Sequence, residues 1–211
     1  MFADRVVAGK KLALKLKEEL PPQLIKDAVV LSIPRGGVIV GEEVSRIFGL
    51  PHHCLITKKI PAPGNEELAI GAVGEGGIVV WDEELCQKLG VNAQYRQEIV
   101  KKKVLELEKK QADFKKGAPA LQLQGKLVIL VDDGVATGAT IKAAIEVVAS
   151  FNPRQIIVAV PVIAKDSLEE IKAKVDKLIF LEAPEMFFSV GQFYENFEQM
   201  SDEEVRRILR Y

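Results

Sequence analysis

The chain alternates between continuous apolar runs and segments in which apolar residues recur at helical spacing. The continuous runs predict buried strands at "AVVLSIP", "HHCLITKKI", "KLVILVDD", "QIIVAVPVIA" and "KLIFLE". The first helically spaced segment begins after a capping Asp4 and ends at Pro21 and Pro22. Strands that alternate with helices predict an α/β fold whose parallel sheet is covered on both faces.

Two regions depart from this alternation. The segment "PAPGNEELAIGAVGEGGIVVW" begins with proline and glycine and predicts a mobile loop that leads into a hairpin. The segments "DEELCQKLG" and "NAQYRQEIVKKKVLELEKKQADFKKG" predict helices capped by Asp82 and Asn92, the second with a solvated, lysine-rich surface. Aromatic residues gather near the C-terminus, before a last helix that Ser201 caps.

The composition is that of a globular protein. The 211 residues carry a formal net charge of -1, with 48% apolar and 28% charged side chains, so no global field would attract nucleic acid or an acidic membrane. No apolar run is long enough to span a bilayer, and the charged N-terminus lacks a signal-peptide core, so we expect a cytoplasmic protein. Cys54 and Cys86 are expected to be reduced thiols, and His52 and His53 to be structural.

The stretch "VILVDDGVATGAT" (128–140) joins a predicted strand to a small-residue loop and a helix. Small residues let backbone N–H groups turn toward one point, and the start of a helix adds unpaired amides. The residues concerned are Gly134, Ala136, Gly138 and Ala139, with hydroxyl donors from Thr137 and Thr140. The Gly-Lys-Ser/Thr ending of a Walker loop is missing, so we expect this loop to bind one phosphate monoester.

Asp132 and Asp133 lie beside this loop, where their charge would repel a free phosphate. Carboxylates accept hydrogen bonds from vicinal hydroxyls and reach magnesium directly or through water. A sugar phosphate satisfies both parts, with its phosphate in the loop and its hydroxyls at the aspartates. The alternative is that the aspartates only cap the helix, although one aspartate would suffice for a cap.

The same stretch resembles the phosphoribosyl-diphosphate (PRPP) signature of type I phosphoribosyltransferases, in which an apolar strand, paired acids and Thr-Gly-x-Thr follow one another. Gly134 departs from that pattern, because many members carry an apolar residue there, and we expect it to loosen the turn. The resemblance implies a Rossmann-like, parallel-sheet α/β core with a small C-terminal hood, PRPP as substrate and Mg²⁺ as cofactor. It implies a single domain over residues 1–211, with its core at about 28–182 and its hood at about 183–200 plus terminal helices.

Two further strand ends contribute to the implied site, because ligands of open α/β sheets bind beyond the carboxyl ends of the strands. "SIPRGG" resembles the family's diphosphate loop, although a plain turn with a surface arginine explains this motif equally well by itself. The implied PRPP-binding residues are Arg35, Gly36, Gly37, Asp132, Asp133, Gly134, Ala136, Thr137, Gly138, Ala139 and Thr140, with Arg35, Asp132 and Asp133 as catalytic candidates. The segment after "ITKKI" resembles the flexible catalytic loop, with an exposed linker as the alternative. Its candidates are Lys58, Lys59, Glu66 and Glu67.

A narrower resemblance covers nearly the whole chain. "FADRVVAGKKLA", "IPRGGVIVGEEV", "APGNEELAIGAVGEGG" and "VILVDDGVATGAT" occur in this order in a group of bacterial and archaeal phosphoribosyltransferases whose acceptor is unassigned. "PEMFFSVGQFYENF" also resembles the hood of hypoxanthine-guanine phosphoribosyltransferases, where an aromatic ring stacks on the purine. Depending on the alignment, that role falls to Phe188 or Phe187, next to Ser189, although core packing explains either ring equally well. Magnesium is expected mainly through PRPP, with Asp132, Asp133 and Glu195 as candidate protein contacts.

We therefore expect a phosphoribosyltransferase, a pentosyl-transferring glycosyltransferase of nucleotide metabolism. It would transfer phosphoribosyl from PRPP to a nitrogen acceptor, for which a nucleobase is one candidate, and release diphosphate. A non-catalytic regulator that senses PRPP or a nucleotide, and a metal-dependent phosphohydrolase, stay open as alternatives. No nucleic-acid or membrane partner is expected, and a homodimer is compatible with this fold.

Overall fold

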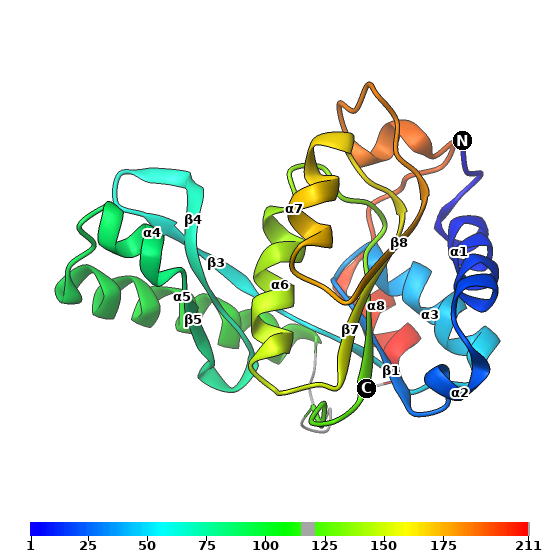
Figure 1. The fold of residues 1–211 in the computed structure, drawn as a ribbon, viewed down its shortest axis with the longest axis horizontal. Coiled ribbons are helices and arrows are strands. Elements are labelled where there is room, and N and C mark those ends of the chain that lie inside the picture. The colour runs from blue at the N-terminus through cyan, green and yellow to red at the C-terminus, as the bar shows by residue number, and fades with distance from the viewer. Residues whose placement is uncertain (115–120, 211) are drawn as a thin grey trace.

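The computed structural model describes residues 1–114 and 121–210 and contains two β-sheets (Figure 1). The larger sheet is parallel, with the strand order β2-β1-β6-β7-β8. Its strands are β1 (Ala28–Ser32), β2 (His52–Cys54), β6 (Leu127–Val131), β7 (Gln155–Val162) and β8 (Lys177–Glu182). Every residue of β1 and β6 is buried, as the continuous apolar runs predicted. The parallel α/β core is therefore confirmed.

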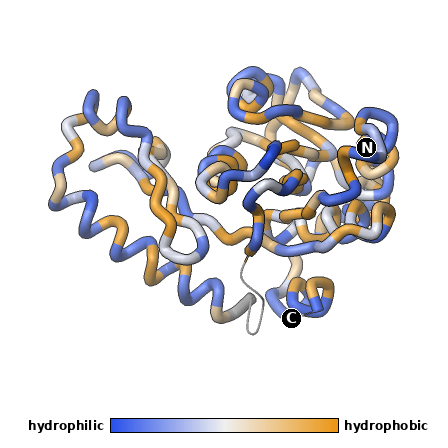
Figure 2. The backbone as a smooth tube through the Cα atoms, turned by 60° about the horizontal axis from the view of Figure 1, so that its bottom comes forward, coloured by the Kyte–Doolittle hydropathy of each residue, from blue (hydrophilic) through white to orange (hydrophobic). Residues whose placement is uncertain are grey.

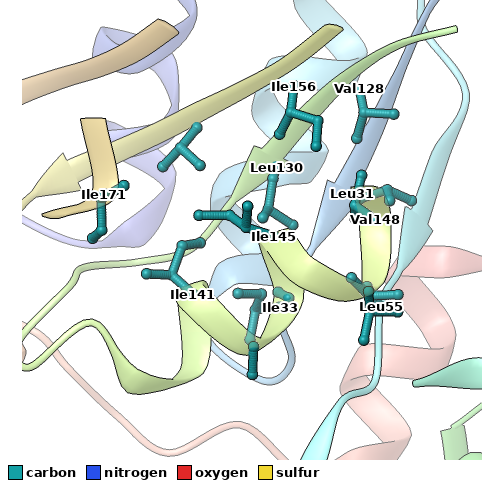
Figure 3. Packing of buried hydrophobic residues seen from close by; sticks show 14 of the residues in the cluster. Leu31, Ile33, Leu55, Val128, Leu130, Ile141, Ile145, Val148, Ile156 and Ile171 are labelled. Atoms are coloured by element: carbon teal, nitrogen blue, oxygen red, sulfur yellow. The ribbon is translucent and has the colours of Figure 1, made fainter. Parts of the chain in front are cut away.

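Helices cover both faces of this sheet. They are α1 (Arg5–Glu19) and α3 (Gly37–Phe48) on one face, and α6 (Ala139–Ala149) and α7 (Leu168–Lys172) on the other. Figure 3 shows the layer under α6, where Ile141, Ile145 and Val148 pack against Leu130 and Ile156 of the strands. Burying such a side chain contributes roughly 1.5–3 kcal/mol, so the amphipathic pattern of each helix selects the face that it covers.

The pairing of β1 with β6 brings two predicted ligand-binding segments to one edge of the sheet. Ser32, the last residue of β1, is in register with Val131, the last residue of β6. The N–H of Ile33 donates to the carbonyl of Val131 at 2.9 Å and extends the pair by one residue. The turn after β1 and the aspartates after β6 therefore leave the sheet side by side.

The smaller sheet and two helices form a lobe that we call the arm, which extends away from the parallel sheet (Figure 1). Its elements are β3 (Lys58–Ala62), β4 (Asn65–Val73), β5 (Val79–Trp81), α4 (Glu83–Lys88) and α5 (Ala93–Phe114). The three strands are antiparallel, and β4 also packs against α6. Figure 2 shows that α5 is mostly hydrophilic: Lys101, Lys102 and Lys109 are exposed and Leu107 is buried, as expected for a solvated helix.

Two predictions for the arm are wrong. The run "HHCLITKKI" is not one strand: β2 ends at Cys54, and β3 begins at Lys58 in the other sheet. Between them, Leu55 packs in the core under α6 and Ile56 in the core of the arm, so the apolar run is a crossover between two cores. The expected loop before the hairpin is itself a hairpin, β3–β4, closed by Pro63 and by Gly64 at a φ of 74°. The hairpin expected around "GEGG" is confirmed as the antiparallel β4–β5 pair.

The C-terminal segment packs against the N-terminus. The N–H of Phe2 donates to the carbonyl of Phe193 at 2.7 Å, and the N–H of Glu195 donates to the carbonyl of Phe2 at 2.8 Å. Ser201 caps the last helix, as predicted. That helix is α8 (Asp202–Leu209), and the shorter turns are α2 (Pro22–Ile25), η1 (Glu75–Gly77), η2 (Lys165–Ser167) and η3 (Val190–Phe193). Within the described ranges, no helix combines the length and the apolar character needed to cross a membrane.

Candidate active site

The loop after β6 leaves the first amides of α6 available to a ligand. Its shape is fixed from β7 and η2: the N–H of Val135 donates to the carbonyl of Val162 at 2.9 Å, and Oγ of Ser167 donates to the carbonyl of Ala136 at 2.6 Å. Gly138 precedes α6 at a φ of 74° and offers no side-chain cap. Because the first N–H groups of a helix have no intrahelical partner, this end can bind an anion.

Asp132 and Asp133 stand beside this loop, in different surroundings. Oδ2 of Asp133 lies 2.7 Å from Nε of Arg5, an α1 residue whose side chain is 9% exposed. Burial, and next the charge of Asp133, raise the pKa of Asp132 well above its ordinary value. Burial also raises the pKa of Asp133, but the Arg5 guanidinium opposes that rise. Asp133 is therefore the ion-paired member of the two, and Asp132 is the one that holds a proton more readily.

The Gly36-Gly37 turn after β1 lies against both carboxylates. A Cβ atom on Gly36 would be 1.8 Å from Oδ2 of Asp133, and one on Gly37 would be 2.9 Å from Oδ1 of Asp132. No larger residue fits at Gly36 unless the Asp133 carboxylate moves. The structure thus brings two of the predicted segments into contact, and this close approach explains both glycines.

Arg35 points in a direction that the sequence did not predict. It follows a cis peptide bond with Pro34, and its side chain is 48% exposed. Nε lies 2.8 Å from Oδ1 of Asp202 in α8, and Nη1 donates to the carbonyl of Met200 at 3.3 Å. In this structure Arg35 therefore binds the C-terminal segment next to the predicted diphosphate loop.

The predicted flexible-loop residues lie on the β3–β4 hairpin. Nζ of Lys58 is 3.6 Å from Oε2 of Glu106 in α5, while Lys59 is part of β3 and Glu66 is exposed on β4. The side chain of Glu67 lies outside the described residues. Burial, and then the charges of Lys58 and Arg35, lower the pKa of Lys110 in α5. The arm thus brings a cation that the sequence did not suggest toward the Arg35 turn.

Comparisons with known proteins decide the family. The sequence pattern of the phosphoribosyl transferase domain matches residues 5–198. The chain belongs to the phosphoribosyltransferase family. Two Mycobacterium tuberculosis proteins (strains CDC 1551 and H37Rv), each provisionally named a phosphoribosyl transferase, are 36% identical over 209 residues, which is 99% of this chain and 46% of theirs. The chain therefore spans about half the length of these relatives.

A solved structure confirms the fold over the whole chain. The crystal structure of TT1426 from Thermus thermophilus is 38% identical, with a TM-score of 0.90, and the match covers 99% of this chain and 97% of that one. The resemblance to phosphoribosyltransferases that the sequence motifs suggested is confirmed.

The two hood phenylalanines of this phosphoribosyltransferase are placed differently. The ring of Phe187 packs against that of Phe193, with centroids 5.0 Å apart, whereas Phe188 is 85% exposed. Ser189, also exposed, caps η3, and Oε1 of Gln192 accepts a hydrogen bond from the N–H of Phe188 at 2.8 Å. Of the two rings, only that of Phe188 is free to stack on a ligand.

Gly134 has a different role from the one expected. We expected it to loosen the turn, but a Cβ atom there would lie 2.5 Å from Cγ1 of Val190 and 2.8 Å from Cγ1 of Val162. Gly134 therefore lets the hood pack directly on the loop.

The described part of the chain holds no group of three His, Cys, Asp or Glu side chains placed to bind a metal ion. Asp132, Asp133 and Glu195 therefore do not form such a group, and Glu195 is exposed on the hood. Asp133 is engaged by Arg5. Both carboxylates are half-buried, but Asp132 has no cationic partner of this kind, which makes it the carboxylate better suited to contact a hard cation carried by a substrate.

Sequence reasoning missed two residues that hold this family's paired acids in place here. Arg5 forms the ion pair with Asp133, and Oη of Tyr194 donates to the carbonyl of Asp133 at 2.6 Å. A signal for Arg5 was present, because it lies two and three helical turns before Leu12 and Leu16, on the buried face of α1. Tyr194 had no such signal, since the aromatic cluster did not indicate which ring would reach the site.

Two other features of this chain do not contain the paired aspartates. Nε2 of His52 lies 2.8 Å from Oγ of Ser32, and Nδ1 lies 3.1 Å from Oε2 of Glu42. This row resembles a hydrolase triad, but Ser32 is 0% exposed, so His52 is structural, as predicted.

The second feature is a cavity of about 630 Å³ between α6, α7 and the arm, whose lining includes Thr137, Trp81 and Lys142 but neither aspartate. Lys142 pairs with Glu170 at 2.8 Å, and Lys174, also in the lining, pairs with Glu146 at 2.7 Å. Its cations are already paired, and of the candidate residues it contains only Thr137 and Ala139 of the phosphate loop. We therefore centre the candidate site on the aspartates at the edge of the sheet, with this cavity bordering its phosphate loop.

Proposed function

We propose that residues 1–211 form one domain that transfers the 5-phosphoribosyl group of PRPP to a nitrogen acceptor and releases diphosphate. One observation carries this proposal: the Gly36-Gly37 turn touches the Asp132-Asp133 pair beside the uncapped start of α6. The start of α6, the aspartates and the Gly36-Gly37 turn would then bind a phosphate, a sugar diol and a diphosphate side by side at this edge of the parallel sheet. Since the chain spans about half of its mycobacterial relatives, the proposal concerns this domain only.

Each part of PRPP has a proposed partner. The amides at the start of α6, with Thr137 and Thr140, would hold the 5-phosphate, and the two aspartates would accept hydrogen bonds from the ribose hydroxyls. The turn at Arg35 would face the diphosphate, and Arg35 would exchange Asp202 for it. Binding these outer groups fixes the anomeric carbon for attack.

Charge at the reacting centre explains why carboxylates are suitable. As the bond to diphosphate breaks, positive charge develops on the ribose ring and negative charge on the leaving group. Asp132 and Asp133 would stabilise the ring, and Mg²⁺ bound with PRPP, in contact with Asp132, would neutralise the diphosphate. Because the pKa of Asp132 is raised, this role predicts that activity decreases as pH is lowered and that carboxylate becomes protonated.

The hood suggests the chemistry of the acceptor. Phe188 is 85% exposed, two residues before the Val190 that packs on Gly134. An exposed aromatic ring favours a planar partner through stacking. We therefore propose a flat nitrogen heterocycle, such as a nucleobase, as the acceptor.

An acceptor screen tests the proposal. The protein is incubated with PRPP, Mg²⁺ and purines, pyrimidines or small amines, and ribosylated products are detected by mass spectrometry. The Asp132→Asn/Asp133→Asn variant is expected to lose turnover by about 100-fold or more, because both carboxylates stabilise the transition state. The exposed Asp27 provides a charge control, and Asp27→Asn should keep full activity.

The rival functions give different results in the same assay. Phosphate release from simple sugar phosphates without an acceptor would favour a hydrolase. Tight PRPP binding with no product from any acceptor would favour a sensor. Unchanged turnover in the double aspartate variant would remove the carboxylates from the site and contradict the proposal.

A further inference from the structure

Arg5 joins three parts of the molecule at the candidate site. It belongs to α1, its Nε is 2.7 Å from Oδ2 of Asp133, and its Nη1 donates to the carbonyl of Glu198 at 2.9 Å. Its guanidinium also lies over the ring of Phe197, 3.7 Å from the centroid. A planar group with several donors can make all three contacts at once, which a lysine ammonium cannot.

The position of Arg5 is itself fixed by the chain around it. Oδ1 of Asp4 accepts a hydrogen bond from the N–H of Val7 at 2.7 Å and begins α1. Phe2 forms a backbone bridge with Tyr194, and their rings lie 5.5 Å apart. Because the backbone on both sides of Arg5 is held in this way, the Cα atom from which its side chain extends is fixed beside the hood.

Asp133 is enclosed by these contacts. Arg5 holds Oδ2, Gly36 leaves no free space beside the same oxygen, and Oη of Tyr194 binds the backbone carbonyl at 2.6 Å. Asp132 is held more loosely, by a bond of 2.9 Å from the N–H of Asp133 to its Oδ1. The two acids are adjacent in sequence but are held by different contacts: Asp133 by a buried arginine, and Asp132 by a neighbouring backbone N–H.

We propose that Arg5 is a positioning residue of the phosphoribosyl site: it holds the Asp133 carboxylate in a fixed orientation for the ribose diol. This inference rests on the proposed function. Arg5 is 8% exposed, so it acts through Asp133 and does not touch the substrate. A partner carboxylate that keeps its position before the ligand arrives loses less entropy on binding.

The test compares ribose 5-phosphate with 2-deoxyribose 5-phosphate by calorimetry. Both carry the phosphate, but only the first has the full diol, so the ratio of their affinities measures the contacts to the 2-hydroxyl, which the proposed function assigns to the aspartates. We expect that ratio to fall about tenfold in Arg5→Gln, which removes a charge-assisted hydrogen bond, and by less in Arg5→Lys. The matched control is Arg46→Gln, which breaks an exposed pair with Glu43 and should leave the ratio unchanged.

Folding is controlled with a second variant. Arg5→Gln leaves a buried charge unpaired, whereas Arg5→Gln/Asp133→Asn removes both charges and should recover thermal stability but not the preference for ribose. If Arg5→Gln does not fold, Arg5→Lys decides: a reduced ratio supports the inference, and an unchanged ratio overturns it. An unchanged ratio in folded Arg5→Gln also overturns it. Wild-type protein that binds neither ribose 5-phosphate nor PRPP would instead overturn the proposed function.

Discussion

Two neighbouring strand ends of this phosphoribosyltransferase domain hold their charged residues in opposite ways. After β6, Asp133 is paired with Arg5, whose side chain is 9% exposed. After β1, Arg35 is 48% exposed, and its contact with Asp202 at 2.8 Å lacks hydrogen-bond geometry, since Oδ1 of Asp202 is buried without a hydrogen-bond partner. We therefore expect the Arg5–Asp133 contact, which we call the fixed end, to persist when a ligand binds, and the Arg35–Asp202 contact, the exchangeable end, to give way.

The energies of the two contacts differ accordingly. Removing one partner of a buried ion pair costs roughly 3–5 kcal/mol, whereas an exposed pair is worth about 0–1 kcal/mol. A ligand can therefore displace Asp202 from Arg35 but not Arg5 from Asp133. This matches what the proposed reaction needs, because the ribose must stay in place while the diphosphate enters and leaves.

The largest expected effect comes from a substitution that displaces the Asp133 carboxylate from Arg5 at the end of β6. Gly36→Ala places a Cβ atom 1.8 Å from Oδ2 of Asp133, although the φ of Gly36, −58°, suits alanine. We expect a loss of about 1–3 kcal/mol in the free energy of unfolding, from overpacking. Ribose 5-phosphate should bind about tenfold more weakly or worse, because the ion pair must shift. Denaturant unfolding and calorimetry measure the two effects.

Gly64→Ala is the matched control for this change. Gly64 has a φ of 74° with open space around it, so alanine there costs stability through backbone strain, by about 1 kcal/mol. Its ligand affinity should be unchanged. If Gly36→Ala binds ribose 5-phosphate like wild type, the Asp133 carboxylate is not fixed, and the difference between the two strand ends disappears.

Much of the β6 end was predictable from sequence, for local reasons. The run from Leu127 to Val131 is apolar because both faces of the strand are covered, and the aspartates and small residues that follow are contiguous. The sheet, its alternating helices and the caps at Asp4 and Asn92 followed from spacing in the same way. These signals need no knowledge of distant contacts.

The rest depends on contacts between residues far apart in sequence. Arg5 and Asp133 are 128 positions apart, and Arg35 turns toward a helix near the C-terminus. The arm was misread because Leu55 and Ile56 are both buried, but in different cores, and a run of apolar letters does not show that change. The hydrophobic pattern therefore located most helices and strands, but only the tertiary structure could show which charged side chains form ion pairs.

The second prediction compares how Asp132 and Asp133, at the end of β6, affect the free energy of unfolding as pH changes. The pKa of Asp132 is raised above 3.8 by burial, so the folded state holds this proton more tightly than the unfolded state. The contribution of Asp132 to the free energy of unfolding is therefore present at low pH, and it is lost as pH rises through the pKa that Asp132 has in the folded state. Asp132→Asn should therefore be more stable than wild type at pH 7, and this advantage should vanish near pH 3.8.

Asp133→Asn should be less stable than Asp132→Asn at pH 7. Burial raises the pKa of Asp133 too, but the Arg5 guanidinium opposes that rise, and the substitution leaves Arg5 without its carboxylate. Thermal unfolding from pH 4 to 8 measures both variants, and a change of about 1 kcal/mol corresponds to a Tm shift of roughly 2–4 °C at this chain length. A loss of stability in Asp132→Asn at pH 7 would show that the two acids are equally anchored.

The smallest expected effect lies at the exchangeable end. Asp202→Asn removes the carboxylate that binds Arg35, so diphosphate with Mg²⁺ should bind more tightly, by up to about fivefold, the equivalent of an exposed ion pair. Glu203→Gln removes a charge from the same turn of α8 and controls for the general field at the start of that helix. Calorimetry at two salt concentrations should show that the gain shrinks as salt rises, because the contact is exposed. Weaker diphosphate binding in Asp202→Asn would mean that Asp202 orients Arg35 toward the ligand, and the β1 end would then be anchored in the same way as the β6 end.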